Sequence, residues 1–225
     1  MKRNPIQLPE EGITEVLLHA CCAPCSSAIV EWMLAHDIRP TIYYYNPNIY
    51  PQEEYIIRKE ESKRHAESLR LRWVDGDYSH DAWRSCVVGM ENEPERGSRC
   101  LECFKMRMLA TARQAQALGM RYFTTTLASS RWKSIEQITA AGMWAQEKVN
   151  GEKRENGELE PVSFWSQNWR KGGLSDRRNQ LLKLYGFYNQ QYCGCEYSMR
   201  PTRNATHGER DGDVERTLQK TLTNK

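Results

Sequence analysis

Three cysteines lie close together near the start of the chain, in the run Cys21-Cys22-Ala23-Pro24-Cys25. Far along the chain, Cys100 and Cys103 follow with two residues between them. Together the two motifs offer more thiols than the four ligands that a single zinc ion binds. Zinc knuckles usually space their cysteines by two or more residues, whereas adjacent cysteines can hold different irons of one cluster. The pair Cys21-Cys22 therefore favours iron–sulfur chemistry.

Two other interpretations of these cysteines stay open at this point. Cys22-x-x-Cys25 and Cys100-x-x-Cys103 have the spacing of a structural zinc site. Cys22 and Cys25 also lie between an expected strand and an expected helix, where the helix dipole lowers a thiol pKa, as in a thioredoxin-like redox couple. The lone Cys86 is interpreted as a small buried apolar residue.

A third cysteine motif, Cys193-Gly194-Cys195, stands near the end of the chain. Two cysteines one residue apart form a disulfide only through a strained turn, which the central glycine permits. Strained disulfides have relatively oxidising, labile potentials, so the pair suits redox chemistry better than structural cross-linking. The alternative is that both cysteines are further metal ligands.

Short apolar runs alternate with helical patterns along the chain. The expected strands are 15–20, 40–45, 72–75 and 121–126, and the expected helices are 26–36, 52–69, 80–88, 106–118, 134–149 and 174–185. This alternation predicts an α/β fold with a parallel sheet flanked by helices and a mostly helical C-terminal section. Ligands of such sheets bind beyond the carboxyl ends of the strands. We expect one composite site there, built from the cysteine motif, Asn46-Pro47-Asn48, Asp75-Gly76-Asp77 and the loop after Thr126.

The length of 225 residues suits one domain with its own core. We divide the chain into an N-terminal extension at 1–14, a single α/β domain at 15–199 and a tail at 200–225 whose polar composition predicts disorder. The mean hydropathy is −0.78. Because the sequence has neither a signal-peptide pattern nor an apolar run of about 18 residues, we expect a cytoplasmic protein with reduced thiols and no membrane partner.

The formal net charge of +3 is too small to indicate a nucleic-acid-binding protein by itself. Locally, Trp169, Arg170 and Lys171 place an aromatic ring beside two cations, and Arg177 and Arg178 follow. Such a stretch can follow a phosphate backbone while a ring stacks on a base. A solvated helix face is the other interpretation.

Four motifs taken together resemble a known family. They are Leu17-Leu18-His19-Ala20-Cys21-Cys22-Ala23-Pro24-Cys25-Ser26, Tyr44-Tyr45-Asn46-Pro47-Asn48-Ile49, Arg99-Cys100-x-x-Cys103 and Tyr192-Cys193-Gly194-Cys195. In this order they are similar to the cobalamin-independent epoxyqueuosine reductases, the QueH family, from about Val16 to Met199. The resemblance implies a two-electron reduction of epoxyqueuosine to queuosine at the wobble position of tRNA, which is the last step of queuosine biosynthesis.

The resemblance also implies a Rossmann-like fold, similar to the nucleotide alpha-hydrolase or PP-loop-like domains, and a set of metal ligands. The implied ligands of a [4Fe–4S] cluster are Cys21, Cys22, Cys100 and Cys103. Cys193 and Cys195 would form a redox-active disulfide. An additional mononuclear iron beside the cluster is implied as well, with Cys25 as our candidate ligand, and no cobalamin is expected.

The reaction further needs substrate contacts, protons and electrons. The substrate-binding candidates are Asn46, Asn48, Trp169, Arg170 and Lys171, with Tyr50, Trp169 or Tyr188 as stacking surfaces for the modified base. The proton-donor candidates are His19, Asp75, Asp77 and Tyr78, although His19 could simply hydrogen-bond inside the sheet. The electron donor is not identified by the sequence.

Two rival functions use the same features. One is a thiol–disulfide oxidoreductase that works through Cys22/Cys25 and Cys193/Cys195. The other is a non-catalytic, zinc-stabilised RNA-binding module. Substrate activation with ATP is disfavoured, because the loop after the first strand lacks a glycine-rich phosphate cradle.

Overall fold

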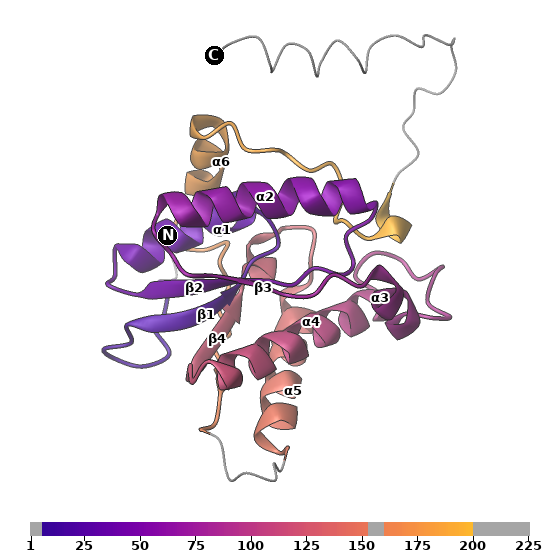
Figure 1. The fold of residues 1–225 in the computed structure, drawn as a ribbon, viewed down its shortest axis with the longest axis horizontal. Helices are drawn as coiled ribbons and strands as arrows, with labels where there is room; N and C mark the ends of the chain where they lie inside the picture. The colour runs from indigo at the N-terminus through magenta and orange to yellow at the C-terminus, as the bar shows by residue number, and fades with distance from the viewer. Residues whose placement is uncertain (1–5, 153–159, 200–225) are drawn as a thin grey trace.

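The computed structural model describes residues 6–152 and 160–199, and within them five parallel strands form one sheet with helices on both faces (Figure 1). The strands are β1 (Glu15–His19), β2 (Arg39–Tyr44), β3 (Trp73–Asp75), β4 (Tyr122–Thr125) and β5 (Ser163–Phe164). The helices are α1 (Ala23–Leu34), α2 (Gln52–Ser68), α3 (His80–Cys86), α4 (Ser98–Ala117), α5 (Ile135–Asn150) and α6 (Leu174–Leu184), with the short 3-10 helices η1 (Thr126–Ser129) and η2 (Glu196–Ser198). The predicted α/β class with a Rossmann-like parallel sheet is confirmed.

The sheet has the strand order β3-β2-β1-β4-β5. β1 is its centre, where His19 is paired with Tyr43 of β2 on one side and with Thr125 of β4 on the other. The chain leaves β1 toward β2 and later returns to the opposite side with β4. The loop after β1, which carries the first cysteine motif, therefore lies at the topological switch point where such sheets bind ligands.

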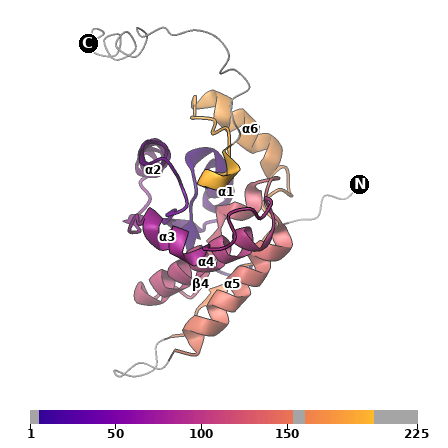
Figure 2. The same ribbon diagram turned by 90° about the vertical axis from the view of Figure 1, so that its right-hand side faces the viewer.

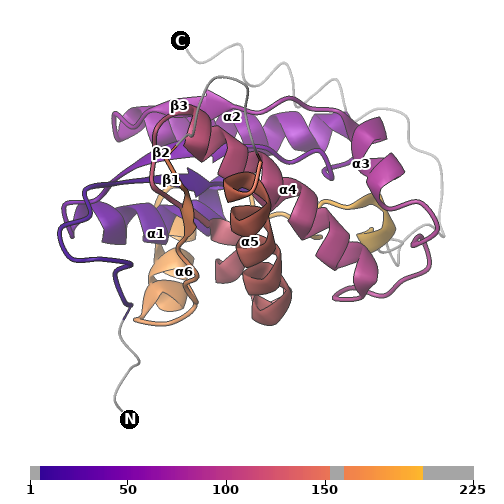
Figure 3. The ribbon, with the colours of Figure 1, turned by 90° about the horizontal axis from the view of Figure 1, so that it is seen from below.

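The core has a layer of helices on each side of the sheet. Figures 2 and 3 show α1, α2 and α6 on one side and α4 and α5 on the other. Because both faces are covered, β1 is buried from Val16 to His19, as the continuous apolar run of an inner parallel strand predicts. Gly142 lets α5 approach β5 closely, since a Cβ at this position would overlap the ring of Phe164.

Two helices begin earlier than the sequence predicts, and both shifts move cysteines onto helices. α1 begins at Ala23 instead of Ser26, because Pro24 lies in its first turn, where its fixed φ suits a helix. Cys25 therefore belongs to the helix and Cys22 becomes its N-cap residue. α4 begins at Ser98, so that Cys100 and Cys103 lie in its first two turns.

The remaining differences concern short elements and the chain ends. β5 is only two residues long and lies in a segment without strand periodicity, so the sequence did not predict it. The predicted polar tail at 200–225 lies outside the described residues, and the division at residues 14 and 199 stays a prediction. Among the helices that the structure describes, none combines the length and apolarity of a membrane span.

Candidate metal centre and substrate cavity

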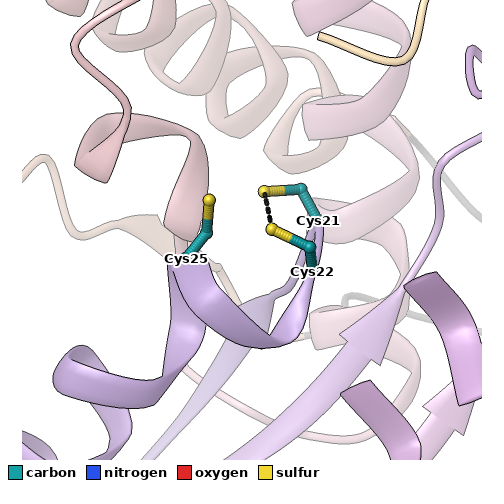
Figure 4. Close-up of side chains that lie close together, drawn as sticks. All are labelled: Cys21, Cys22 and Cys25. Atoms are coloured by element: carbon teal, nitrogen blue, oxygen red, sulfur yellow. Dashed lines mark hydrogen bonds between the residues drawn. The ribbon is translucent and has the colours of Figure 1, made fainter. Parts of the chain in front are cut away.

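Cys21, Cys22 and Cys25 form a compact buried group at the carboxyl end of β1 (Figure 4). Their Sγ atoms all lie within 4.8 Å of one another, and those of Cys21 and Cys22 are 3.8 Å apart. The extended backbone of Cys22 turns the chain into α1, which brings Cys25 back toward the other two thiols. Three converging thiols are a donor set for a soft metal or an iron–sulfur centre.

Hydrogen bonds and charges around this group favour a thiolate. Hydrogen bonds with the thiols of Cys22 and Cys25 lower the pKa of Cys21, and the positive charges of Lys133 and Arg107 act in the same direction. Burial raises the pKa of Cys22. Because a metal binds the deprotonated thiol, Cys21 is the thiol of the group that gives up its proton most easily.

Two neighbouring side chains orient the cysteine group. The Thr126 hydroxyl oxygen accepts a hydrogen bond from the backbone N–H of Cys21 at 3.1 Å and contacts its Sγ at 3.4 Å. The Gln190 amide Nε2 donates to the Sγ of Cys22 at 3.1 Å. Thr126 follows β4, whereas Gln190 comes from the C-terminal segment, so elements distant in sequence meet at the cysteine group.

A cavity of about 620 Å³ opens beside the cysteine group. Its lining includes the loops after β1, β2, β4 and β5, side chains of α2, α4 and α6, Glu95 and the segment 189–193. The cationic side chains in its lining are Arg58, Arg107, Arg131, Lys133, Arg170 and Arg178, and Glu95 is the one carboxylate among the described lining residues. Of the four loops that were expected to build one composite site beyond the carboxyl ends of the strands, those after β1, β2 and β4 contribute to the cavity lining.

The loop after β3 differs from this expectation, since it contributes no described residue to the cavity lining. Asp75 pairs with Lys59 of α2 at 3.0 Å. The Tyr78 hydroxyl donates to the backbone carbonyl of Ile49 at 2.8 Å. β3 is an edge strand, so its loop lies outside the switch point between β1 and β4.

Cys100 and Cys103 lie apart from the group of three thiols, which does not include them. Cys100 is half-buried and lines a second, smaller cavity of about 30 Å³ together with Cys193 and Cys195. Cys103 is buried and packs with Cys195 in the same apolar cluster. Cys193 lines both cavities. It therefore stands between the large cavity, which Cys21 and Cys25 also line, and the small cavity, which Cys100 and Cys195 also line.

Cys193 and Cys195 are both free thiols in the structure. Gly194 between them has a φ of +112°, a backbone conformation that L side chains rarely adopt. Burial raises the pKa of the Cys195 thiol to about 12. Cys195 therefore stays protonated at neutral pH, next to a Cys193 that lines the large cavity.

The two asparagines of the loop after β2 have different environments. Asn46 is held on both ends of its carboxamide, because Nδ2 donates to the Ala20 carbonyl at 2.9 Å and Oδ1 accepts from Arg107. Asn48 lines the cavity, is only 1% exposed, and its Oδ1 has no hydrogen-bond partner. An unpartnered buried amide oxygen is costly, so Asn48 is the asparagine that is poised for a ligand.

Trp169, Arg170 and Lys171, the three residues of the predicted basic stretch, also have different environments. Arg170 lines the cavity and donates to the carbonyls of Ser130 and Lys133. Lys171 is exposed and is not among the lining residues. Trp169 is 1% exposed and packs in the core against Trp32 and Trp165, so its ring is not accessible for stacking on a base.

The other aromatic and acid–base candidates have structural partners. Nδ1 of His19 accepts from the Thr125 hydroxyl at 2.8 Å and Nε2 donates to the Tyr45 carbonyl at 3.0 Å, while burial lowers its pKa to about 3. His19 is thus a neutral residue that hydrogen-bonds inside the sheet, which was the alternative to a role as proton donor. Tyr50 is 42% exposed and stacks on His80, whereas the Tyr188 hydroxyl donates to Glu54.

Sequence reasoning missed Lys133 and Gln190, both of which line the cavity. Burial lowers the pKa of the Lys133 ammonium, but negative charge on Cys193, Cys21 and Cys25 together raises it by more, so the ammonium stays charged. The basic residues Arg131 and Lys133, in the loop that follows β4 and η1, were a usable signal for this residue. Gln190 had no comparable signal, because its role depends on a contact across most of the chain.

Comparison with known proteins agrees with the cysteine motifs. The family model described as epoxyqueuosine reductase QueH matches residues 16–201. A relative from Histophilus somni, named epoxyqueuosine reductase QueH, is 46% identical over 200 residues, which cover 89% of this chain and 78% of the relative. Relatives of the same name from Haemophilus influenzae and Acinetobacter baylyi are 45% and 42% identical, over 88% and 89% of this chain and 76% and 87% of their own lengths. The chain therefore belongs to the QueH family of epoxyqueuosine reductases, which are oxidoreductases.

Proposed function

We propose that this protein reduces the epoxide of epoxyqueuosine in the wobble position of tRNA to the alkene of queuosine, with a [4Fe–4S] cluster and without cobalamin. The observation that carries the proposal is the group of three thiols within 4.8 Å beside a large cavity lined by cations. The cavity offers room for a modified base, and the cations suit the phosphates that surround it.

The donor set of the first cysteine group fits a thiolate-bound metal, and a four-thiolate cluster would draw its other two ligands from α4, whose cysteines lie apart from that group. Cys21 and Cys22 supply two adjacent thiols, and Cys100 and Cys103 supply two more, one turn apart on α4. In this assignment Cys25 is free to bind the additional iron beside the cluster. When bound, the cluster supplies electrons one at a time.

The chain can itself supply a matched pair of electrons. Oxidation of the Cys193 and Cys195 thiols to a disulfide releases two electrons and two protons, and these convert an epoxide to an alkene and water. Gly194 gives the turn the unusual backbone conformation that so short a disulfide loop requires. An external electron donor then has to reduce the disulfide for the next turnover.

Two kinds of side chain hold the substrate in this proposal. The Asn48 Oδ1 accepts a hydrogen bond from a hydroxyl or amino group of the modified base, since no group of the protein occupies it. Arg131, Arg170 and Arg178 contact phosphates of the anticodon loop around the cavity. The need for reduced thiols favours the cytoplasm as the compartment.

The decisive test is anaerobic incubation of the reduced protein with tRNA that carries epoxyqueuosine, followed by mass analysis of the nucleosides. We expect loss of one oxygen atom and formation of queuosine without added cobalamin. Purified anaerobically, the protein should be brown and contain iron and acid-labile sulfide. A colourless protein with one zinc and no conversion would instead support the zinc-stabilised RNA-binding module.

A further inference from the structure

Helix α2 is packed with its charged face inward. Glu54, Arg58 and Glu61 are at most 9% exposed, whereas Ile56 and Ile57 are each 47% exposed. Burial of charged groups is costly unless each has a specific partner. The segment that covers the inward face of α2 must therefore supply hydrogen-bond or ion-pair partners for these charges.

The chain after α6 covers this face, passing along α2 toward η2 (Figure 1). The guanidinium of Arg58 donates to the carbonyl of Cys193 through Nη1 and to that of Tyr192 through Nη2, each at 3.3 Å. It also lies 5.2 Å from the centre of the Tyr192 ring. A single side chain of α2 thus contacts both residues that lead into the Cys193-Gly194-Cys195 turn.

Two carboxylates complete the attachment. Glu54 fixes the guanidinium, with 2.7 Å between the Arg58 Nε and its Oε1, and its Oε2 accepts from the Tyr188 hydroxyl at 2.8 Å. Glu61 accepts from the backbone N–H of Tyr188 at 2.7 Å. The hydrogen bond to Glu54 holds the Arg58 guanidinium in one orientation. Removal of either partner would leave an unpaired buried charge, which is costly.

The turn itself fits closely against α2 and the loop before it. The Gly194 carbonyl accepts from the backbone N–H of Tyr50 at 2.8 Å. A Cβ on Gly194 would lie 3.0 Å from Cγ1 of Ile49 and 3.1 Å from Nη1 of Arg58. The position of the two thiols relative to the cavity therefore depends on Arg58 from one side and on Tyr50 from the other.

From these contacts we infer that Arg58, held by Glu54, is a positioning residue that fixes the Cys193-Gly194-Cys195 turn at the wall of the substrate cavity. The inference rests on the proposed redox role of that cysteine pair. Arginine is required because its planar fork donates to two carbonyls at once, whereas a lysine ammonium lacks this geometry.

The first test compares Arg58→Met and Arg58→Lys with Arg64→Met, a control on the exposed side of the same helix. We expect both Arg58 variants to lower kcat by about 10²-fold with little change in KM, as a small misplacement of a reacting group does. Iron content and the visible spectrum should be unchanged. The Cys193 thiol should be alkylated faster, because the turn is no longer held. The lysine variant retains the buried charge, so full recovery of kcat by lysine would overturn the inference.

A double-mutant cycle separates this inference from the proposed function. In a Cys193→Ser/Cys195→Ser background, Arg58→Met should cause no further loss of kcat. An equal loss in both backgrounds would show that Arg58 acts elsewhere and would overturn the inference. If the serine variant alone keeps full turnover, the proposed redox role fails instead. In that case the alkylation rate of Cys193 in the single Arg58 variants still tests the positioning role. An unchanged rate would refute it.

Discussion

At the scale of single residues, the site is defined by which polar atoms lack a partner inside the protein. Asn46 and Asn48 have the same side chain and are two residues apart, yet only Asn48 has a free amide oxygen at the cavity. The cysteines likewise differ in their surroundings, although their side chains are identical. Cys21, Cys22 and Cys25 converge, whereas Cys86 is half-buried and its Sγ lies 3.9 Å from the carbonyl of Glu102.

The proposed ligand assignment predicts different results for two cysteines. Cys103→Ala should lose the cluster, with its colour, iron and acid-labile sulfide, because a cluster needs its fourth thiolate. Cys25→Ala should keep the sulfide and lose only the additional iron. Elemental analysis and electron paramagnetic resonance measure both. Cys86→Ala is the control and should resemble the unmodified protein. Loss of all sulfide in Cys25→Ala would make Cys25 a cluster ligand.

Asn48→Ala should raise KM for the modified tRNA by about fivefold, because a hydrogen bond between neutral groups contributes about 1 kcal/mol. Steady-state kinetics at several tRNA concentrations measures this change. Asn46→Ala is the matched comparison. It should lower the melting temperature instead, since it leaves the Ala20 carbonyl and the Arg107 guanidinium without their partner. An unchanged KM in Asn48→Ala would remove Asn48 from the substrate contacts.

At the scale of elements, the early starts of α1 and α4 and the inward charges of α2 decide the geometry of the site. α1 brings Cys25 to the cysteines after β1, and α4 presents Cys100 and Cys103 in its first two turns. α2 holds the C-terminal segment that carries the third cysteine motif. The same interface includes His65, whose ring meets the rings of Tyr185 and Phe187 edge-on at 5.6 Å and 5.1 Å.

Burial lowers the pKa of His65 below its ordinary value of 6.5. The folded state therefore favours the neutral ring, and its contribution to stability is full above about pH 6.5 and is lost as the pH falls through the lowered pKa. We expect the free energy of unfolding, from urea titrations between about pH 7.5 and pH 5, to fall less steeply in His65→Phe than in the unmodified protein. Identical slopes would show that His65 does not contribute to the acid sensitivity.

At the scale of the whole molecule, the net charge of +3 conceals a strongly uneven distribution. Six cations line the cavity beyond the carboxyl ends of the strands, with Glu95 as the one described carboxylate among them. A concave site with one sign of charge concentrates field and attracts polyanions. This edge of the sheet is therefore the surface that we expect RNA to approach.

Arg131→Ala and Arg178→Ala should each weaken tRNA binding and reduce the slope of log Kd against log salt by about 0.7, the value for one phosphate contact to a single strand. Titrations at several salt concentrations measure the slope. Arg39→Ala is the control, because Arg39 is exposed at the start of β2, on the opposite edge of the sheet. Equal slopes in all three variants would move the RNA interface away from the cavity.

Much of the fold and of the motif set was predictable from local patterns. β1, β2 and α2 occur within one residue of the predicted bounds, since apolar runs and helical periodicity are properties of neighbouring residues. β5 was not predictable, because two residues carry no period. Trp169 was misread for a related reason. Its neighbours Arg170 and Lys171 indicate a surface, whereas packing against Trp32 and Trp165 puts its ring in the core.

Residue identity and short-range spacing were enough to predict the family, the α/β class and the position of the first cysteine motif directly after a strand. The three-dimensional structure was needed to show which thiols converge, which asparagine keeps a free oxygen and why α2 buries its charges. The three converging thiols meet within the turn from β1 into α1, whereas the asparagines and α2 depend on contacts between segments far apart in sequence, such as Asn46 with Arg107 and Arg58 with Cys193. Burial and hydrogen-bond geometry determine such pairings, and no local pattern encodes them.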